Sequence, residues 1–73
     1  MMKDNWENRA SNLLKAELAR RGLGYEELRA ALEKIGVTKS ASNINKTINL
    51  GKFPFSFFLQ CAEAIGLNNV QLL

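Results

Sequence analysis

The chain has 73 residues, with ten lysines and arginines against seven aspartates and glutamates, which gives a formal net charge of +3. One cysteine, Cys61, and no histidine exclude a disulfide framework and the ordinary zinc-binding patterns. No apolar run approaches the roughly 18 residues that span a bilayer, and the chain opens on "MMKD" rather than on a signal peptide. We therefore expect one cytoplasmic domain, residues 1–73, near the lower size limit for a single apolar core.

The charges are unevenly distributed along the chain. Acids and bases nearly balance over residues 1–36, whereas no acid occurs from Lys34 through Ala62. That window contains Lys39, Lys46 and Lys52, so a partner that approaches it meets uncompensated positive charge. Taken alone, three lysines indicate a solvated surface rather than a nucleic-acid site.

The first predicted helix runs from about Asn5 to Arg21. Asp4 and Glu7 have the spacing of a capping box at its start, and Gly22 provides a left-handed stop at its end. Apolar residues recur at helical intervals and predict the buried face. These are Trp6, Ala10, Leu13, Leu14 and Leu18.

A second helix is predicted over about Tyr25 to Ile35. Its apolar face consists of Leu28, Ala31, Leu32 and Ile35. After it, Gly36 can take the left-handed conformation, Val37 can fold back on the helix, and Thr38 can cap the next one. A turn of three or four residues that pivots on glycine is typical of a helix-turn-helix unit, which here would cover residues 25–50.

The segment from Lys39 to Leu50 could be a strand or a helix. Ile44, Ile48 and Leu50 fall at even positions, as in a strand, but no other part of the chain offers a partner strand. In a helix, Ala41, Ile44 and Ile48 share the inward face. We therefore predict a third helix over about residues 39–50, closed by Gly51.

The helical interpretation places short polar side chains and lysines on the outward face. They are Lys39, Ser40, Ser42, Asn43, Asn45, Lys46 and Asn49, with Lys52 just beyond the helix. Asparagine can bond both groups of an adenine edge, serine can donate or accept, and lysine reaches guanine or phosphate. The alternative is that these residues are simply solvated, although a surface helix usually prefers Glu, Lys, Gln and Ala.

The last part of the chain, residues 53–73, is an apolar helix and tail. Pro54 can help to start a fourth helix over about Ser56 to Ile65, with Gly66 as its stop. The inward stripe is predicted to be Phe58, Cys61, Ala62 and Ile65. Phe55, Phe57 and Leu59 are left on other faces, either in a dense core or on a self-association surface. The ending "NNVQLL" could be a short fifth helix or an arm.

From Leu13 to Leu67 the order of elements resembles the lambda-repressor-like, or XRE-type, family of helix-turn-helix proteins. "LLKAELARRGLGYEEL" is similar to the first helix and the start of the second, and "GVTKSASNI" to the turn and recognition helix. "NLGK" is similar to the exit from the recognition helix, and "FFLQCAEAIGL" to the next helix. Residues 1–12 would extend the first helix. The chain also resembles a group of small bacterial proteins of this type described only as a domain of unknown function. The resemblance implies an all-α, compact fold of four to five helices.

The resemblance also implies a transcriptional regulator that inserts its third helix into the major groove of double-stranded DNA. Under this hypothesis Ser40, Ser42, Asn43 and Lys46 meet base edges. Lys39, Asn49 and Lys52 would then hold phosphates. A homodimer formed through Phe55, Phe57 and Leu59 would read two half-sites about 34 Å apart.

The alternative function is a protein-interaction module that keeps the fold and binds a partner through its Phe-rich C-terminal surface. The small number of lysines favours it, as does Leu50, where the family usually has a polar residue. An enzyme is not expected, since the sequence shows no histidine, no glycine-rich phosphate loop and no metal-ligand spacing. We also expect no cofactor, no metal and no small-molecule ligand.

Overall fold

The computed structural model describes residues 5–70, and these residues form four α-helices and no strand. The helices are α1 (Trp6–Arg20), α2 (Tyr25–Lys34), α3 (Ala41–Leu50) and α4 (Phe55–Ile65). The predicted all-α class is therefore confirmed, and the helical interpretation of 39–50 holds for Ala41–Leu50. Residues 67–70 contain no helix, so the short fifth helix is not seen in the part of "NNVQLL" that is described.

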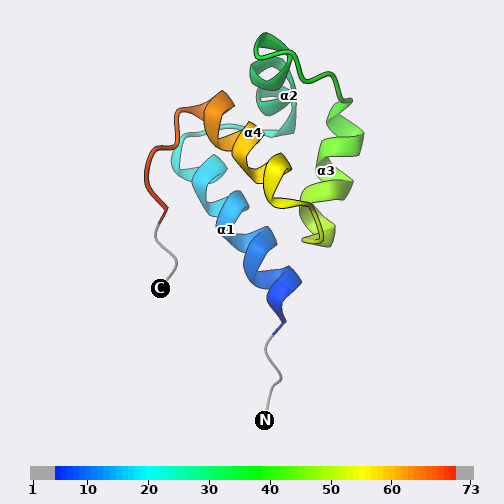
Figure 1. Cartoon of the computed structure of the whole chain (residues 1–73), viewed down its shortest axis with the longest axis vertical. Coiled ribbons are helices and arrows are strands. Elements are labelled where there is room, and N and C mark those ends of the chain that lie inside the picture. The colour runs from blue at the N-terminus through cyan, green and yellow to red at the C-terminus, as the bar shows by residue number, and fades with distance from the viewer. Residues whose placement is uncertain (1–4, 71–73) are drawn as a thin grey trace.

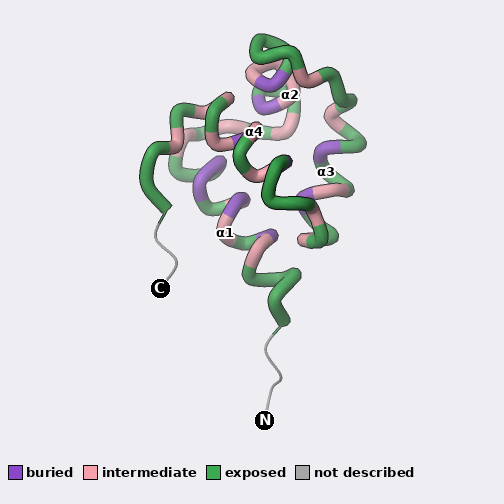
Figure 2. Tube along the Cα trace, viewed as in Figure 1, coloured by how far each residue is buried: buried purple, intermediate pink, exposed green. Residues whose placement is uncertain are grey.

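The four helices each contribute one pair of buried apolar side chains spaced four residues apart. The pairs are Leu14 and Leu18, Leu28 and Leu32, Ile44 and Ile48, and Phe57 and Cys61. Residues at this spacing lie one above the other on the same side of a helix. The buried positions meet where the helices face one another (Figure 2). The core is therefore small, and each helix contributes about one turn to it.

Packing joins α1 to α3, and α2 to both α3 and α4. In Figure 1, α3 forms one side of the molecule, and the segment that comes after α4 runs along the other side. This arrangement leaves one long surface of α3 without a neighbouring helix. The ends of α1 and α4 also meet, because Arg21 Nε, just after α1, donates a hydrogen bond to the carbonyl of Ile65 at 3.3 Å.

Burial differs from the prediction at the helix ends and on α4. Trp6 is 66% exposed and Ile35 is 40% exposed, because each occupies a helix end beyond the reach of the central core. Phe57, predicted for the self-association surface, is 4% exposed and belongs to the core. Its ring packs against Phe53 at a centroid distance of 5.5 Å, because α4 turns the side that carries Phe57 and Cys61 toward the core. Phe58 is only half-buried.

The helix caps bear on two further predictions. The α1 N-cap is Asn5, whose side chain accepts a hydrogen bond from the Asn8 amide at 3.0 Å; the capping role predicted for Asp4 falls outside the described residues. The α3 N-cap is Ser40 rather than Thr38. Residues 35–40 therefore separate α2 from α3, six residues instead of the predicted three or four.

The turn after α2 otherwise agrees with the prediction. Gly36 has a φ of +87°, and the Val37 amide donates a hydrogen bond back to the Leu32 carbonyl at 2.9 Å. Val37 also packs against the core. The chain then extends through Thr38 and Lys39 before α3 begins, which is the extra length that the sequence pattern did not reveal.

The end of α3 lies directly against the start of α1. Gly51 has a φ of +70°, and a Cβ placed on it would lie 2.0 Å from the carbonyl oxygen of Glu7. No side chain fits in that space, so the two backbones touch. This contact fixes how α3 is held relative to α1.

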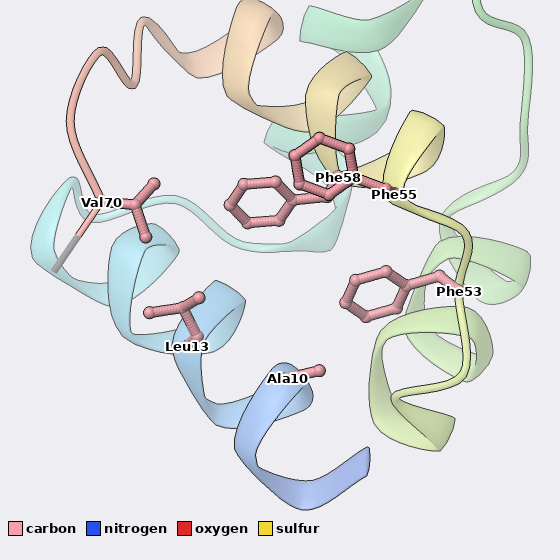
Figure 3. A pocket seen from close by; sticks show the side chains of 6 residues that line it. All are labelled: Ala10, Leu13, Phe53, Phe55, Phe58 and Val70. Atoms are coloured by element: carbon pink, nitrogen blue, oxygen red, sulfur yellow. The ribbon is translucent and has the colours of Figure 1, made fainter. Parts of the chain in front are cut away.

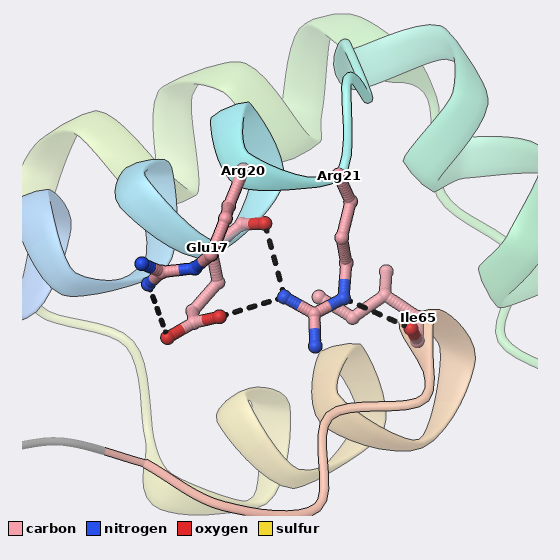
Figure 4. A network of polar contacts seen from close by, with 4 residues as sticks. All are labelled: Glu17, Arg20, Arg21 and Ile65. Carbon is pink, nitrogen blue, oxygen red and sulfur yellow. Dashed lines mark hydrogen bonds and ion pairs between the residues drawn. The ribbon is translucent and has the colours of Figure 1, made fainter.

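A polar network anchors the other end of α1 (Figure 4). The Glu17 carboxylate, almost fully buried, receives hydrogen bonds from Arg20 at 2.8 Å and from Arg21 at 2.7 Å. The hydrogen bonds from Arg21 and then Arg20 hold the pKa of Glu17 below its ordinary value. Because Arg21 also reaches Ile65, the network joins the ends of α1 and α4.

Candidate functional site

All eight residues predicted for the outward face of the third helix are exposed. They are Lys39, Ser40, Ser42, Asn43, Asn45, Lys46, Asn49 and Lys52. They lie on α3 and on the residues immediately before and after it, on the side that Ile44 and Ile48 turn away from the core. At 3.6 residues per turn, Ser42, Lys46 and Asn49 occupy the outermost row. We call these eight residues the α3 face.

The first turn of the α3 face is shaped by its cap. Ser40 Oγ accepts a hydrogen bond from the Asn43 amide at 3.0 Å, which satisfies one of the unpaired donors of a helix start. The Ser40 hydroxyl proton stays available to a ligand. Lys39 lies beside this cap, with its Nζ 5.9 Å from the centre of the Phe57 ring.

One edge of the α3 face is a set of linked amides. Asn49 Nδ2 donates hydrogen bonds to the Asn45 carbonyl at 2.8 Å, to Asn45 Oδ1, and to the Tyr25 hydroxyl at 3.3 Å. These contacts occupy the NH2 group of Asn49 and leave its Oδ1, together with the Tyr25 O–H, directed to solvent or a ligand. Asn45 and Asn49 are therefore held in fixed positions.

Tyr25 is the residue at this edge that the sequence did not assign to the α3 face. It lies 24 positions before Asn49 and reaches it from the first turn of α2. Only the packing of α2 on α3 brings the two together, and no spacing within either helix indicates it. The structure therefore adds a phenol group to the surface predicted from α3 alone.

The opposite edge has a second pair of polar side chains. Thr47 Oγ1 donates a hydrogen bond to Asn43 Oδ1 at 3.5 Å. No hydrogen bond among residues 5–70 uses the NH2 group of Asn43, so two donors point outward there. Leu50, 65% exposed, closes the α3 face at its C-terminal end with an apolar side chain.

The charges of the α3 face are all positive and lack acidic partners. In the part of the chain that the structure describes, the ion pairs join Glu17 to Arg20 and Arg21, in α1 and at its C-cap, and Arg29 to Glu26 and Glu33, within α2. Hydrogen bonding from Arg29 lowers the pKa of Glu26. Lys39, Lys46 and Lys52 take part in none of these pairs, so their charge is available to an anion.

Residues 5–70 offer no group of three potential metal-binding side chains. Cys61 is fully buried, and burial raises the pKa of its thiol to about 12. A thiol in this environment stays protonated and acts as a small apolar core residue. Among the same residues, no helix has the length and apolar character needed to cross a membrane.

The comparisons with known proteins give one result. Neither the curated proteins nor the solved structures contain a match to this chain. A family model described as "Domain of unknown function (DUF6471)" matches residues 6–70, which include all four helices and the whole α3 face. The chain belongs to the DUF6471 family.

Proposed function

We propose that this protein is a DNA-binding regulator that places the α3 face in the major groove, with α2 and α3 acting as a helix-turn-helix unit. The observation that carries the proposal is the composition of the α3 face. Three lysines that form no ion pair within residues 5–70 lie among short amide and hydroxyl side chains on an exposed helix, with no acid in the α3 face. Contacts to phosphates require the lysines, and contacts to base edges require the short amide and hydroxyl side chains.

The hydrogen bonds of the α3 face suggest a role for each part of it. Ser42, Asn43 and Lys46 present groups that meet base edges, and Ser40 adds a donor at the helix start. Lys39, Lys52 and Asn49 lie at the two ends of the face and would contact phosphates. Asn45 acts mainly by fixing Asn49, because the Asn49 amide donates to it.

The charge of the α3 face leads to a quantitative test by fluorescence anisotropy with a labelled random-sequence duplex. If each bound chain neutralises three phosphates, the salt dependence has a slope of about −2.7, so affinity falls roughly 40-fold between about 50 and 200 mM salt. Removing one lysine with Lys46→Gln should reduce this loss to roughly 12-fold and weaken binding at low salt.

Lys15→Gln is the matched control, since it removes the same charge from α1 and not from the α3 face. It should retain the wild-type salt dependence. Flat anisotropy at micromolar protein, or equal effects of Lys46→Gln and Lys15→Gln, would contradict DNA binding through α3.

A second candidate function is that of a protein-interaction module without DNA binding. It is favoured by the six-residue connection between α2 and α3 and by the exposure of Phe55 and Leu59, at 70% and 52%. An apolar interface changes little with salt, whereas phosphate contacts weaken steeply. The salt titration with the labelled duplex therefore separates the two candidates.

A further inference from the structure

An apolar cavity of about 410 Å³ lies between α1, the connection from α3 to α4, and α4. Its lining consists of Ala10, Leu13, Phe53, Phe55, Phe58 and Val70. Figure 3 shows the three phenylalanine rings on one side of the hollow and the two α1 side chains on the other. Since liquid water occupies about 30 Å³ per molecule, this space can hold a large side chain.

Exposed apolar side chains continue from the cavity over both helices. Trp6 is 66% exposed and lies beside Ala10 and Leu13, which line the cavity too. Phe55 is 70% exposed at the rim, and Leu59, one turn further along α4, is 52% exposed. We call the cavity lining together with Trp6 and Leu59 the α1–α4 face.

The exposed area of the α1–α4 face approaches what a stable dimer needs. Aromatic side chains present 150–250 Å² each, so Trp6 and Phe55 leave roughly 300 Å² of mostly apolar surface in solvent. A standard interface buries about 800 Å² of each partner. In homodimers about 65% of the interface area is apolar. Two side chains thus provide more than half of that apolar area, and the cavity lining and Leu59 add to it.

We propose that the α1–α4 face is a homodimer interface in which a second copy of this chain covers the cavity. The face combines projecting rings with a hollow, and a two-fold interface pairs each such feature with its counterpart on the other copy. No residue of the α1–α4 face belongs to α3, so the dimer leaves the α3 face uncovered. The inference therefore stands independently of DNA binding.

Charges at the edges of the α1–α4 face fit a second copy. Arg9 lies three residues after Trp6, and its guanidinium carbon is 4.8 Å from the centre of the indole ring. On the α4 edge, Glu63 lies four residues after Leu59 and is exposed. Because the ends of α1 and α4 meet at Arg21 and Ile65, Arg9 and Glu63 lie toward opposite ends of the groove, and a two-fold axis that crosses the groove obliquely between them sets Arg9 of each copy beside Glu63 of the other.

The test measures mass and tryptophan fluorescence over a concentration series of the full chain. Sedimentation velocity should show a monomer converting to a dimer as concentration rises. Trp6 is the only tryptophan, so its emission should shift to shorter wavelength over the same range as it leaves water. Phe55→Gln and Leu59→Gln should each raise the dimer dissociation constant at least roughly tenfold.

Leu50→Gln is the matched control, because Leu50 is 65% exposed but lies on α3. It should dimerise as the wild type does. Circular dichroism and the urea midpoint check that all three variants fold, as expected for exposed positions. A wild type that stays monomeric to several hundred micromolar, a mass change without a Trp6 shift, or equal weakening by Leu50→Gln and Phe55→Gln would overturn the proposal.

Discussion

Replacing Gly51 with alanine should separate two helices by placing one carbon where there is no space. A Cβ at this position would lie 2.0 Å from the Glu7 carbonyl oxygen and 2.6 Å from its carbonyl carbon, and both are backbone atoms that no side-chain rotation can move. The first turn of α1 must therefore shift away from the end of α3. That shift loosens the packing of the Ile48 side chain, which is fully buried next to this end.

Two other glycines separate the steric effect from backbone strain. Gly22 and Gly66 have φ values of +68° and +74°, close to the +70° of Gly51, but no atom lies within 4 Å of a Cβ built on either. Alanine at Gly22 or Gly66 should cost only the left-handed conformation, about 1–2 kcal/mol. Alanine at Gly51 adds the clash and lost packing, for a total of about 4 kcal/mol or more.

The assay is urea unfolding monitored by far-ultraviolet circular dichroism. A chain of this length has a total stability of roughly 4–11 kcal/mol and a urea dependence of about 1 kcal/mol per molar. The Gly22→Ala and Gly66→Ala midpoints should fall by about 1–2 M, whereas the Gly51→Ala midpoint should fall by about 4 M or more. If all three variants lose the same stability, the close approach of α1 and α3 is not a real constraint.

Three further predictions concern buried groups. The folded-state pKa of Glu17 is lowered, so the stabilising effect of its carboxylate should be complete above the ordinary value of 4.5 and should be lost as pH falls through the folded-state pKa. The urea midpoints of wild type and Glu17→Gln should therefore converge as pH falls through that range. At pH 8, the thiol of Cys61, with its pKa of about 12, should react with a disulfide reagent roughly a thousandfold more slowly when folded than in urea. Arg21→Lys should lower the urea midpoint by roughly 1 M, since lysine cannot bond Glu17 and Ile65 together, while Arg20→Lys, at a 63% exposed side chain, should change it little.

Each of these has a result that would contradict it. A constant difference between wild type and Glu17→Gln from neutral pH to pH 3 would show that the carboxylate charge is not what stabilises this site. Labelling of folded Cys61 within tenfold of the unfolded rate would mean that the core around it opens readily. Equal midpoints for Arg21→Lys and Arg20→Lys would remove the connection to Ile65 as a stabilising contact.

Local sequence signals located the helices well because their causes are local. Glycine and charged residues act within one helical turn, and they predicted the ends of α2 and α4 to within one residue. The same holds for the inward side of α3, where Ile44 and Ile48 are both fully buried. The eight predicted residues of the α3 face are exposed for the same reason.

The predictions that were wrong depended on contacts between helices. Phe57 and Phe58 are adjacent and equally apolar, and only the position of α2 against α4 decides which one is buried. Trp6 fits the stripe of α1, but α3 meets that end of the helix at Glu7 and leaves the Trp6 side chain 66% exposed. Tyr25 is likewise placed beside Asn49 by packing. The pattern of one helix does not contain this information.

The two proposed surfaces are joined by the short connection between α3 and α4. Lys52 is exposed next to the α3 face, and Phe53 lines the cavity of the α1–α4 face. Pro54 comes next and restricts the backbone at that point. Gly51, just before Lys52, lies directly against the backbone of Glu7. A second copy docked on the α1–α4 face would therefore meet a rigid junction rather than a loose linker. Under both proposals, the dimer would fix the separation of its two α3 helices, which is the quantity that a DNA duplex with two half-sites measures.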